Sequence, residues 1–173
     1  YVWVKRAGDV IPYVSEVELS KREKINEKYK VPKLCPCKEF LIIKSSSETV
    51  RRCSGGSKCK FQKRESLKHY VSKKAMNIDG LGEKQIEKFI DLEIIDSKSD
   101  IYHIQKHSIK IINLEGYGEK SFKNLINSIN ESKNTTLTRY IFSLGLRYVG
   151  ENNSELLAQF FQSKDSFKKL INS

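Results

Sequence analysis

A seven-residue stretch that occurs twice constrains the fold of this chain more than any other feature. Residues 78–84 read Ile-Asp-Gly-Leu-Gly-Glu-Lys, and residues 114–120 read Leu-Glu-Gly-Tyr-Gly-Glu-Lys. Each copy precedes apolar residues at the spacing of a helix with one buried face. Repeated helix–turn–helix units of this length must stack to bury those faces, so the chain is predicted to be mainly α-helical. The apolar residues are Ile86, Phe89 and Ile90 after the first copy, and Phe122, Leu125, Ile126 and Ile129 after the second.

A third, weaker copy follows at residues 147–151, Arg-Tyr-Val-Gly-Glu. It keeps Gly150, but Tyr148 takes the place of the first glycine. We expect a helix over residues 137–146 before this copy and another helix after it, and a fourth unit begins near the end of the chain. The inward residues are predicted to be Tyr140, Ile141 and Leu144 before the copy, Leu156, Leu157, Phe160 and Phe161 after it, and Phe167, Leu170 and Ile171 in the fourth unit.

A Gly-x-Gly turn that opens a helix presents backbone N–H groups at the positive end of the helix dipole, which suits a phosphate. A single such turn is more simply a connection between helices, but the repeated pair followed by Glu-Lys favours phosphate binding. Glycine permits close approach and a positive φ. The predicted contacts are amides near Gly80, Gly82, Gly116, Gly118 and Gly150, with charge added by Lys84 and Lys120.

The charge of the chain, formally +11, indicates a polyanionic partner. Lysines often form only a solvated face. Here, however, ten Lys or Arg stand against two acidic residues between Lys44 and Lys74, next to the first glycine turn. We predict a basic track along a nucleic-acid backbone formed by Arg51, Arg52, Lys58, Lys60, Lys63 and Arg64.

The four cysteines, Cys35, Cys37, Cys53 and Cys59, predict a zinc site. Their spacing is C-x-C, fifteen residues, then C-x5-C, with hairpin-like sequence between the pairs. Four thiolates at one point suit tetrahedral zinc, which organises a segment too small for its own core. Two disulfides are the alternative, and the lack of a secretory signal argues against them. The C-x-C pair is one residue shorter than the usual knuckle, which predicts weakened metal binding.

The other segments connect these features. Residues 1–19 predict two short strands broken at residues 7–9, the tail of a β-domain, and residues 20–30 predict a linker or exposed helix. Residues 61–77 predict a helix with Leu67, Tyr70, Val71 and Ala75 on one face and His69 in a packing role. The chain lacks an initiator Met and a membrane-length apolar run, and we expect it to be a fragment of a longer protein.

Residues 69–84 resemble the bacterial NAD-dependent DNA ligases at the junction of their zinc finger and helix-hairpin-helix domain. Residues 6–12, Arg-Ala-Gly-Asp-Val-Ile-Pro, resemble the end of that family's OB-fold domain, and residues 145–151 match as well. The resemblance covers almost the whole chain. It implies a mainly α fold in three parts: the end of an OB-fold with a linker (1–30), a four-cysteine zinc finger (31–62) and a tandem helix-hairpin-helix domain (63–173), truncated in its fourth unit.

The resemblance also implies a function. The family forms phosphoric ester bonds, sealing nicks in duplex DNA during replication and repair with NAD and magnesium. The Lys-x-Asp-Gly motif of its adenylation domain is absent here, so we expect no catalytic residue, no NAD or other small-molecule binding and no ligation by this chain alone. The implied chain is a cytoplasmic, nucleoid-associated monomer that binds nicked double-stranded DNA, with no membrane partner. Lys5 and Arg6 would lie near the nick. The family has glycine where Lys38 stands.

Two alternatives belong to other functional classes. One is a non-enzymatic adaptor in which a zinc ribbon and helical hairpins bind nucleic acid or protein. The other is a subunit of a nuclease or repair complex, which ranks lower because the sequence has no cluster of Asp and Glu suited to metal-dependent cleavage. An adenylation domain upstream in the reading frame would decide for the ligase.

Overall fold

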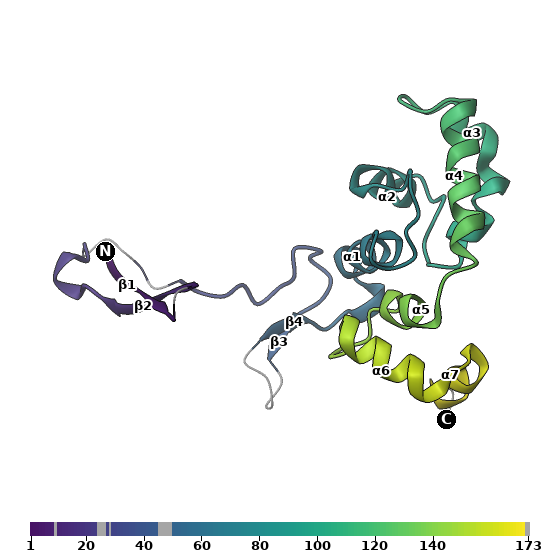
Figure 1. The fold of residues 1–173 in the computed structure, drawn as a ribbon. Coiled ribbons are helices and arrows are strands. Elements are labelled where there is room, and N and C mark those ends of the chain that lie inside the picture. The colour runs from purple at the N-terminus through teal and green to yellow at the C-terminus, as the bar shows by residue number, and fades with distance from the viewer. Residues whose placement is uncertain (9, 24–26, 28, 45–49, 172–173) are drawn as a thin grey trace. The chain divides into compact units, whose positions relative to one another are not determined.

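The computed structural model describes residues 1–173 apart from 9, 24–26, 28, 45–49 and 172–173 (Figure 1). The chain divides into two compact units, residues 1–33 and residues 34–173. Each unit has its own internal contacts.

The first unit is a β-hairpin. Strands β1 (Val2–Ala7) and β2 (Ile11–Val17) pair antiparallel, with Ala7 opposite Ile11 and a register shift after Trp3. The strand break expected at residues 7–9 is confirmed on its described side, because Gly8 turns the chain with φ +58° while residue 9 lies outside the described residues. A 3-10 turn, η1 (Leu19–Lys21), follows the hairpin. Both faces of the hairpin are open: Val4, on one face, is 59% exposed, and Ile11, on the other, is 65% exposed.

The second unit begins with a small cysteine-bearing hairpin. Strands β3 (Ile42–Lys44) and β4 (Arg51–Cys53) pair antiparallel, with Ile42 opposite Cys53. A 3-10 turn, η2 (Gly56–Lys58), leads directly into α1. The expected hairpin between the two cysteine pairs is therefore confirmed, and its tip at residues 45–49 lies outside the described residues.

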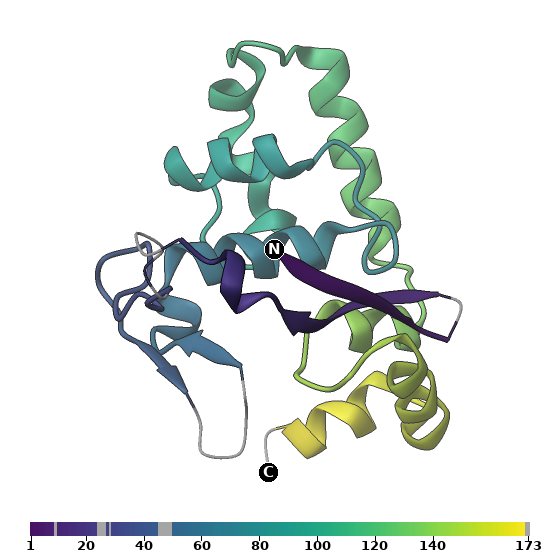
Figure 2. The ribbon, with the colours of Figure 1, turned by 90° about the vertical axis from the view of Figure 1, so that its left-hand side faces the viewer.

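The rest of the second unit is helical, which confirms the mainly α prediction (Figures 1 and 2). No described helix is long and apolar enough to cross a membrane. The helices in chain order are α1 (Lys60–Val71), α2 (Glu83–Asp91), the 3-10 helix η3 (Asp100–His107), α3 (Ser108–Ile112), α4 (Glu119–Ser132), α5 (Leu137–Ser143), α6 (Glu151–Phe161) and α7 (Lys164–Ile171).

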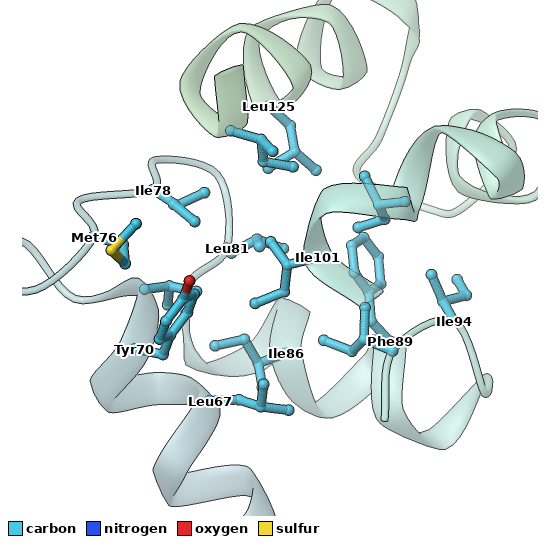
Figure 3. Packing of buried hydrophobic residues seen from close by; sticks show 14 of the residues in the cluster. Leu67, Tyr70, Met76, Ile78, Leu81, Ile86, Phe89, Ile94, Ile101 and Leu125 are labelled. Carbon is cyan, nitrogen blue, oxygen red and sulfur yellow. The ribbon is translucent and has the colours of Figure 1, made fainter. Parts of the chain in front are cut away.

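One apolar core joins the first two glycine-turn units, and Figure 3 shows its side chains meeting between the helices. Leu67 from α1, Ile86 and Phe89 from α2, Ile101 from η3 and Leu125 from α4 are each 1% exposed or less. The i, i+3 spacing of Ile86 and Phe89 places both on the buried face of α2, as predicted. This shared core fixes the two turns to one scaffold.

Three expectations about helices need correction. The helix predicted over 61–77 ends at Val71, because Ser72 has ψ 156° and residues 72–77 form a turn. Ala75 is fully buried, but it packs from that turn and not from the helix. The helix predicted over 137–146 ends at Ser143, since the chain must turn at Gly145 with φ +67°.

The predicted apolar face of α6 is correct only in part. Phe161 is half-buried, and its ring lies 5.4 Å from that of Phe167, which is 2% exposed. Leu156 and Phe160, in contrast, are 63% and 79% exposed. They lie on the side of α6 that the described helices leave uncovered, so hydrophobicity alone misassigned them to the core.

Candidate metal centre and nucleic-acid interface

The hairpin brings all four cysteines together. Their Sγ atoms lie within 4.8 Å of one another, and those of Cys35 and Cys59 are 3.8 Å apart. None of the four described cysteines forms a disulfide, since an S–S bond would place two sulfurs at about 2.05 Å. The predicted convergence is confirmed, and the geometry favours a metal ion over two disulfides.

The donor set fits a thiophilic dication. Four thiolates at about 2.3 Å from a tetrahedral ion would lie about 3.8 Å from each other, which matches the Cys35–Cys59 separation. The backbone N–H groups of Gln62 and Phe61 lower the pKa of the Cys59 thiol to about 7. The N–H of Cys37 acts in the same sense on Cys35, but burial and the neighbouring cysteines raise the pKa of Cys35 to about 12. A bound cation would favour the thiolate form of all four.

Two backbone details allow this small site to close. Lys38 adopts φ +64°, a left-handed conformation, and its N–H donates to the carbonyl of Cys35 over 2.8 Å. That tight turn forms the shortened C-x-C loop. On the other side, the Gly55 N–H donates to Cys53 Sγ over 3.4 Å. A Cβ on Gly55 would lie 2.3 Å from the Phe40 ring, so only glycine fits there. Sequence reasoning missed Gly55, although it lies between the second pair of cysteines.

The three glycine-turn copies follow the same backbone path. Gly80 has φ +88° and Gly116 has φ +82°. Tyr148, in the corresponding position of the third copy, has φ +65°, a conformation that is uncommon for a residue with a side chain. The second glycine of each copy (Gly82, Gly118 or Gly150) is the N-cap of the helix that follows, α2, α4 or α6. The tyrosine therefore does not abolish the third turn.

These turns leave the starts of three helices open. At the N-caps of α2, α4 and α6, no side chain among the described residues accepts a hydrogen bond from the first-turn N–H groups. Such groups need an acceptor, and an anion is well suited because of the helix dipole. The first two turns are also joined, since the Tyr117 hydroxyl donates to the carbonyl of Gly80 over 3.0 Å. Their helix starts are thus held in fixed relation.

The predicted basic track divides into two kinds of residue. Lys63 pairs with Asp96, while Arg64 lies 3.1 Å from Glu87 and 3.8 Å from Asp91. Lys63 and Arg64 thus tie α1 to α2 and the loop after it. The other predicted residues are exposed: Lys84 and Lys120 after the glycine turns, Arg51, Arg52, Lys58 and Lys60 in or beside the cysteine hairpin, and Lys5 and Arg6 on β1 in the first unit.

Several side chains that sequence reasoning did not single out hold the first turn. Lys68 pairs with Glu65 and with Glu83, and its hydrogen bond lowers the pKa of the Glu83 carboxyl. Arg139 of α5 donates to the carbonyl of Ala75 over 2.8 Å and also to that of Lys73. The contact of Lys68 with Glu83 and those of Arg139 link sequence positions too distant for local patterns to reveal, whereas Lys68 and Glu65 are only three residues apart on α1.

The packing role expected for His69 is confirmed. Its Nε2 lies 2.7 Å from the carbonyl oxygen of Phe142, and the two rings are 4.8 Å apart. A Cβ on Gly145 would lie 3.3 Å from the His69 ring. His69 therefore belongs to the contact between α1 and α5 and not to the cysteine cluster.

Comparison with known proteins identifies relatives along almost the whole chain. The chain is 40% identical to a DNA ligase of Acinetobacter baylyi over 168 residues, 97% of the chain. It is 40% identical to a DNA ligase of Rickettsia bellii over 96% of the chain and 42% identical to one of a Psychrobacter species over 92%. The chain spans about a quarter of the length of these relatives. No family model matches it.

Proposed function

We propose that this chain is the DNA-gripping, C-terminal portion of a bacterial NAD-dependent DNA ligase, an assignment consistent with its relationship to proteins named DNA ligase. It holds duplex DNA at a nick while the remainder of the enzyme, which uses NAD and magnesium, forms the bond. The observation that carries this proposal is the pair of linked glycine turns, Gly80 and Gly116, each opening a helix whose first N–H groups lack a side-chain acceptor among the described residues.

The recognition is of the DNA backbone. The N–H groups that follow Gly82 and Gly118 donate to phosphate oxygens, and Lys84 and Lys120 add charge. Because Tyr117 joins the two turns, they contact phosphates at a fixed spacing. Contacts of this kind carry no direct base information, which suits an enzyme that must join a nick in any sequence.

The cysteine cluster is proposed to hold a structural zinc ion. Cys35, Cys37, Cys53 and Cys59 supply four sulfur donors and leave no open position for a substrate, as in structural zinc sites. The ion would supply cohesion to a hairpin that has little core of its own. The hairpin then presents Arg51 and Arg52, together with Lys58 and Lys60, along the same DNA.

The remaining assignments follow from this proposal. Residues 1–30 form the end of an OB-fold and a linker, residues 31–62 the zinc finger, and residues 63–173 a helix-hairpin-helix domain. Lys5 and Arg6 contact DNA near the nick. The chain acts as a monomeric part of a cytoplasmic enzyme associated with the nucleoid, and it does not ligate by itself.

A salt-dependent binding measurement tests the proposal. The 173-residue chain is titrated into labelled duplex DNA, nicked and intact, at increasing salt concentration. We expect binding at low salt that weakens steeply, because each phosphate contact contributes about 0.9 to the logarithmic slope. No binding to duplex DNA at low salt, or binding that does not change with salt, would contradict the proposal. A strong preference for RNA would instead favour the adaptor.

A further inference from the structure

A glutamate is the first residue of each helix that follows a glycine turn. It is Glu83 in α2, Glu119 in α4 and Glu151 in α6. A carboxylate in the first turn of a helix interacts favourably with the helix dipole. It carries the same sign of charge as a phosphate, however, and would repel one bound to the same helix start. Phosphate binding at these turns therefore requires that the charge of the glutamate be offset.

Lys68 of α1 offsets the charge of Glu83. Its side chain is only 19% exposed, and its ammonium forms an ion pair with Glu83 and lies 2.7 Å from the Glu65 carboxylate and 3.9 Å from that of Glu87. The hydrogen bond from Lys68 lowers the pKa of the Glu83 carboxyl. The charge of Lys68 is thus already committed to carboxylates within the chain, and Lys68 is not a free cation for DNA.

The Lys68–Glu83 pair borders the hollow at the first glycine turn. This hollow has a volume of about 360 Å³, and its charged lining residues among those described are Lys68, Lys73, Asp79 and Glu83. Two positive and two negative charges balance there, so the loss of Lys68 would leave the hollow with a net negative charge. Glu65, the other close partner of Lys68, does not line the hollow.

The pairing of Glu83 also leaves the start of α2 open. Its carboxylate bonds to Lys68, and no described side chain caps the helix at Gly82. A similar pair occurs at the third turn, where the Lys74 ammonium, in the turn after α1, donates to Glu151 over 2.6 Å. One short segment of chain thus supplies the lysines for two helix starts.

We propose that Lys68 is a positioning residue for DNA: it holds and neutralises Glu83 so that the start of α2 can accept a backbone phosphate. The inference rests on the proposed DNA-binding function and deepens it. Lys68 does not contact the phosphate. It acts through Glu83, whose negative charge would otherwise oppose the phosphate at the first glycine turn.

A double-mutant cycle tests this role. The full chain is compared with Lys68→Met, Glu83→Gln and the double variant in titrations against nicked duplex DNA at low salt. Lys68→Met should weaken binding about fivefold, the effect of one unfavourable charge at a helix start. The same change made in the Glu83→Gln background should cost almost nothing, because no carboxylate then remains to be neutralised. An equal loss in both backgrounds would show that Lys68 acts on DNA directly and would overturn the inference.

Glu65 provides the matched control. It is also an ion-pair partner of Lys68, but it lies on α1 and away from the glycine turn. Lys68→Met combined with Glu65→Gln has the same net charge as Lys68→Met combined with Glu83→Gln. Only the Glu83→Gln combination should recover the affinity of the unaltered chain. Equal recovery by both would attribute the effect to net charge and overturn the inference.

Stability measurements separate this role from a purely structural one. Most of these carboxylates are exposed, and such ion pairs contribute little to stability, so each variant should unfold within about 4 °C of the unaltered chain. A fall in Tm that parallels the loss of affinity across the variants would mean that Lys68 only supports the fold, which would overturn the inference. Should Lys68→Met unfold the chain, Lys68→Gln removes the charge but keeps a hydrogen-bond donor, and the same pattern of affinities is expected.

The outcomes also distinguish this inference from the proposed function. If the unaltered chain does not bind duplex DNA at low salt, the proposed function fails. If the chain binds DNA and Lys68→Met binds equally well, the proposed function stands and only the role of Lys68 is refuted.

Discussion

Replacing each glycine of the second turn by serine should have opposite effects on stability. Gly116 has φ +82° and Gly118 has φ −164°, and a Cβ added to either would meet no atom of the described residues within 4 Å. Packing is therefore the same for both, and the backbone conformation decides. Gly116→Ser forces a side chain into the left-handed region, which costs about 1–2 kcal/mol. Gly118→Ser places a good N-cap residue at the start of α4, which gains roughly a few tenths of a kcal/mol.

Urea unfolding followed by far-ultraviolet circular dichroism measures this difference, with thermal unfolding as a second readout. For a unit of this size, about 1 kcal/mol corresponds to roughly 2–4 °C in Tm, so Gly116→Ser should unfold about 2–8 °C below the unaltered chain. The Tm of Gly118→Ser should equal or slightly exceed that of the unaltered chain. Equal stabilities for the two variants, or a loss only in Gly118→Ser, would refute the assignment of positive φ to Gly116.

The Gly118→Ser change should weaken DNA binding even though it does not reduce stability. The hydroxyl introduced by Gly118→Ser would accept a hydrogen bond from a first-turn N–H of α4 and compete with phosphate. We expect this variant to be at least as stable as the unaltered chain yet to bind duplex DNA several-fold more weakly. Unchanged affinity would show that the start of α4 does not contact DNA.

Three further perturbations follow from the described contacts. Tyr148→Gly should stabilise the chain by about 0.5–1 kcal/mol in urea unfolding, because it relieves the left-handed tyrosine at some cost in backbone entropy; a loss of stability would contradict this. Metal analysis of the purified chain should find about one zinc per chain, and almost none in Cys59→Ala, which lacks one of the four sulfur ligands. Zinc retained by Cys59→Ala would exclude the four-sulfur site. The N–H groups of Asp96 and Ser97 donate to Asp100, lowering its carboxyl pKa below the ordinary 3.8. The free energy of unfolding that Asp100→Ala loses relative to the unaltered chain should therefore be constant from about pH 5 to 7 and should shrink as pH falls below about 3.8. A difference that grows toward low pH would contradict the lowered pKa of Asp100.

Local sequence patterns identified the features that depend on near neighbours. The glycine turns predict where helices begin. The apolar residues that follow each turn predict the buried face of the helix, because helical periodicity places residues three and four apart on one side. Ile86 and Phe89 are buried as expected. The cysteine cluster followed from count and spacing, since the hairpin needs few residues to return Cys53 toward Cys35.

Features that depend on distant partners were not predictable in the same way. Lys63 and Arg64 have the composition of a DNA-binding surface, but their ion pairs reach α2 and Asp96, far along the chain. The exposure of Phe160 is likewise set by which helices cover α6. At Tyr148 the missing glycine weakened the expected third turn, whereas the surrounding structure maintains φ +65° despite the side chain.

Cys59 connects the four-cysteine cluster to the helix that leads to the first glycine turn. Its Sγ belongs to the four-sulfur cluster, and its backbone is the N-cap of α1, with its carbonyl accepting the Lys63 N–H over 2.9 Å. The cluster and the helix therefore share a residue. Because α1 has 12 residues and is about 18 Å long, a tilt of about 10° at Cys59 would move its far end by about 3 Å. A small change in the position of Cys59 would therefore be magnified along α1. The positions of the four sulfurs thus influence where the first glycine turn lies.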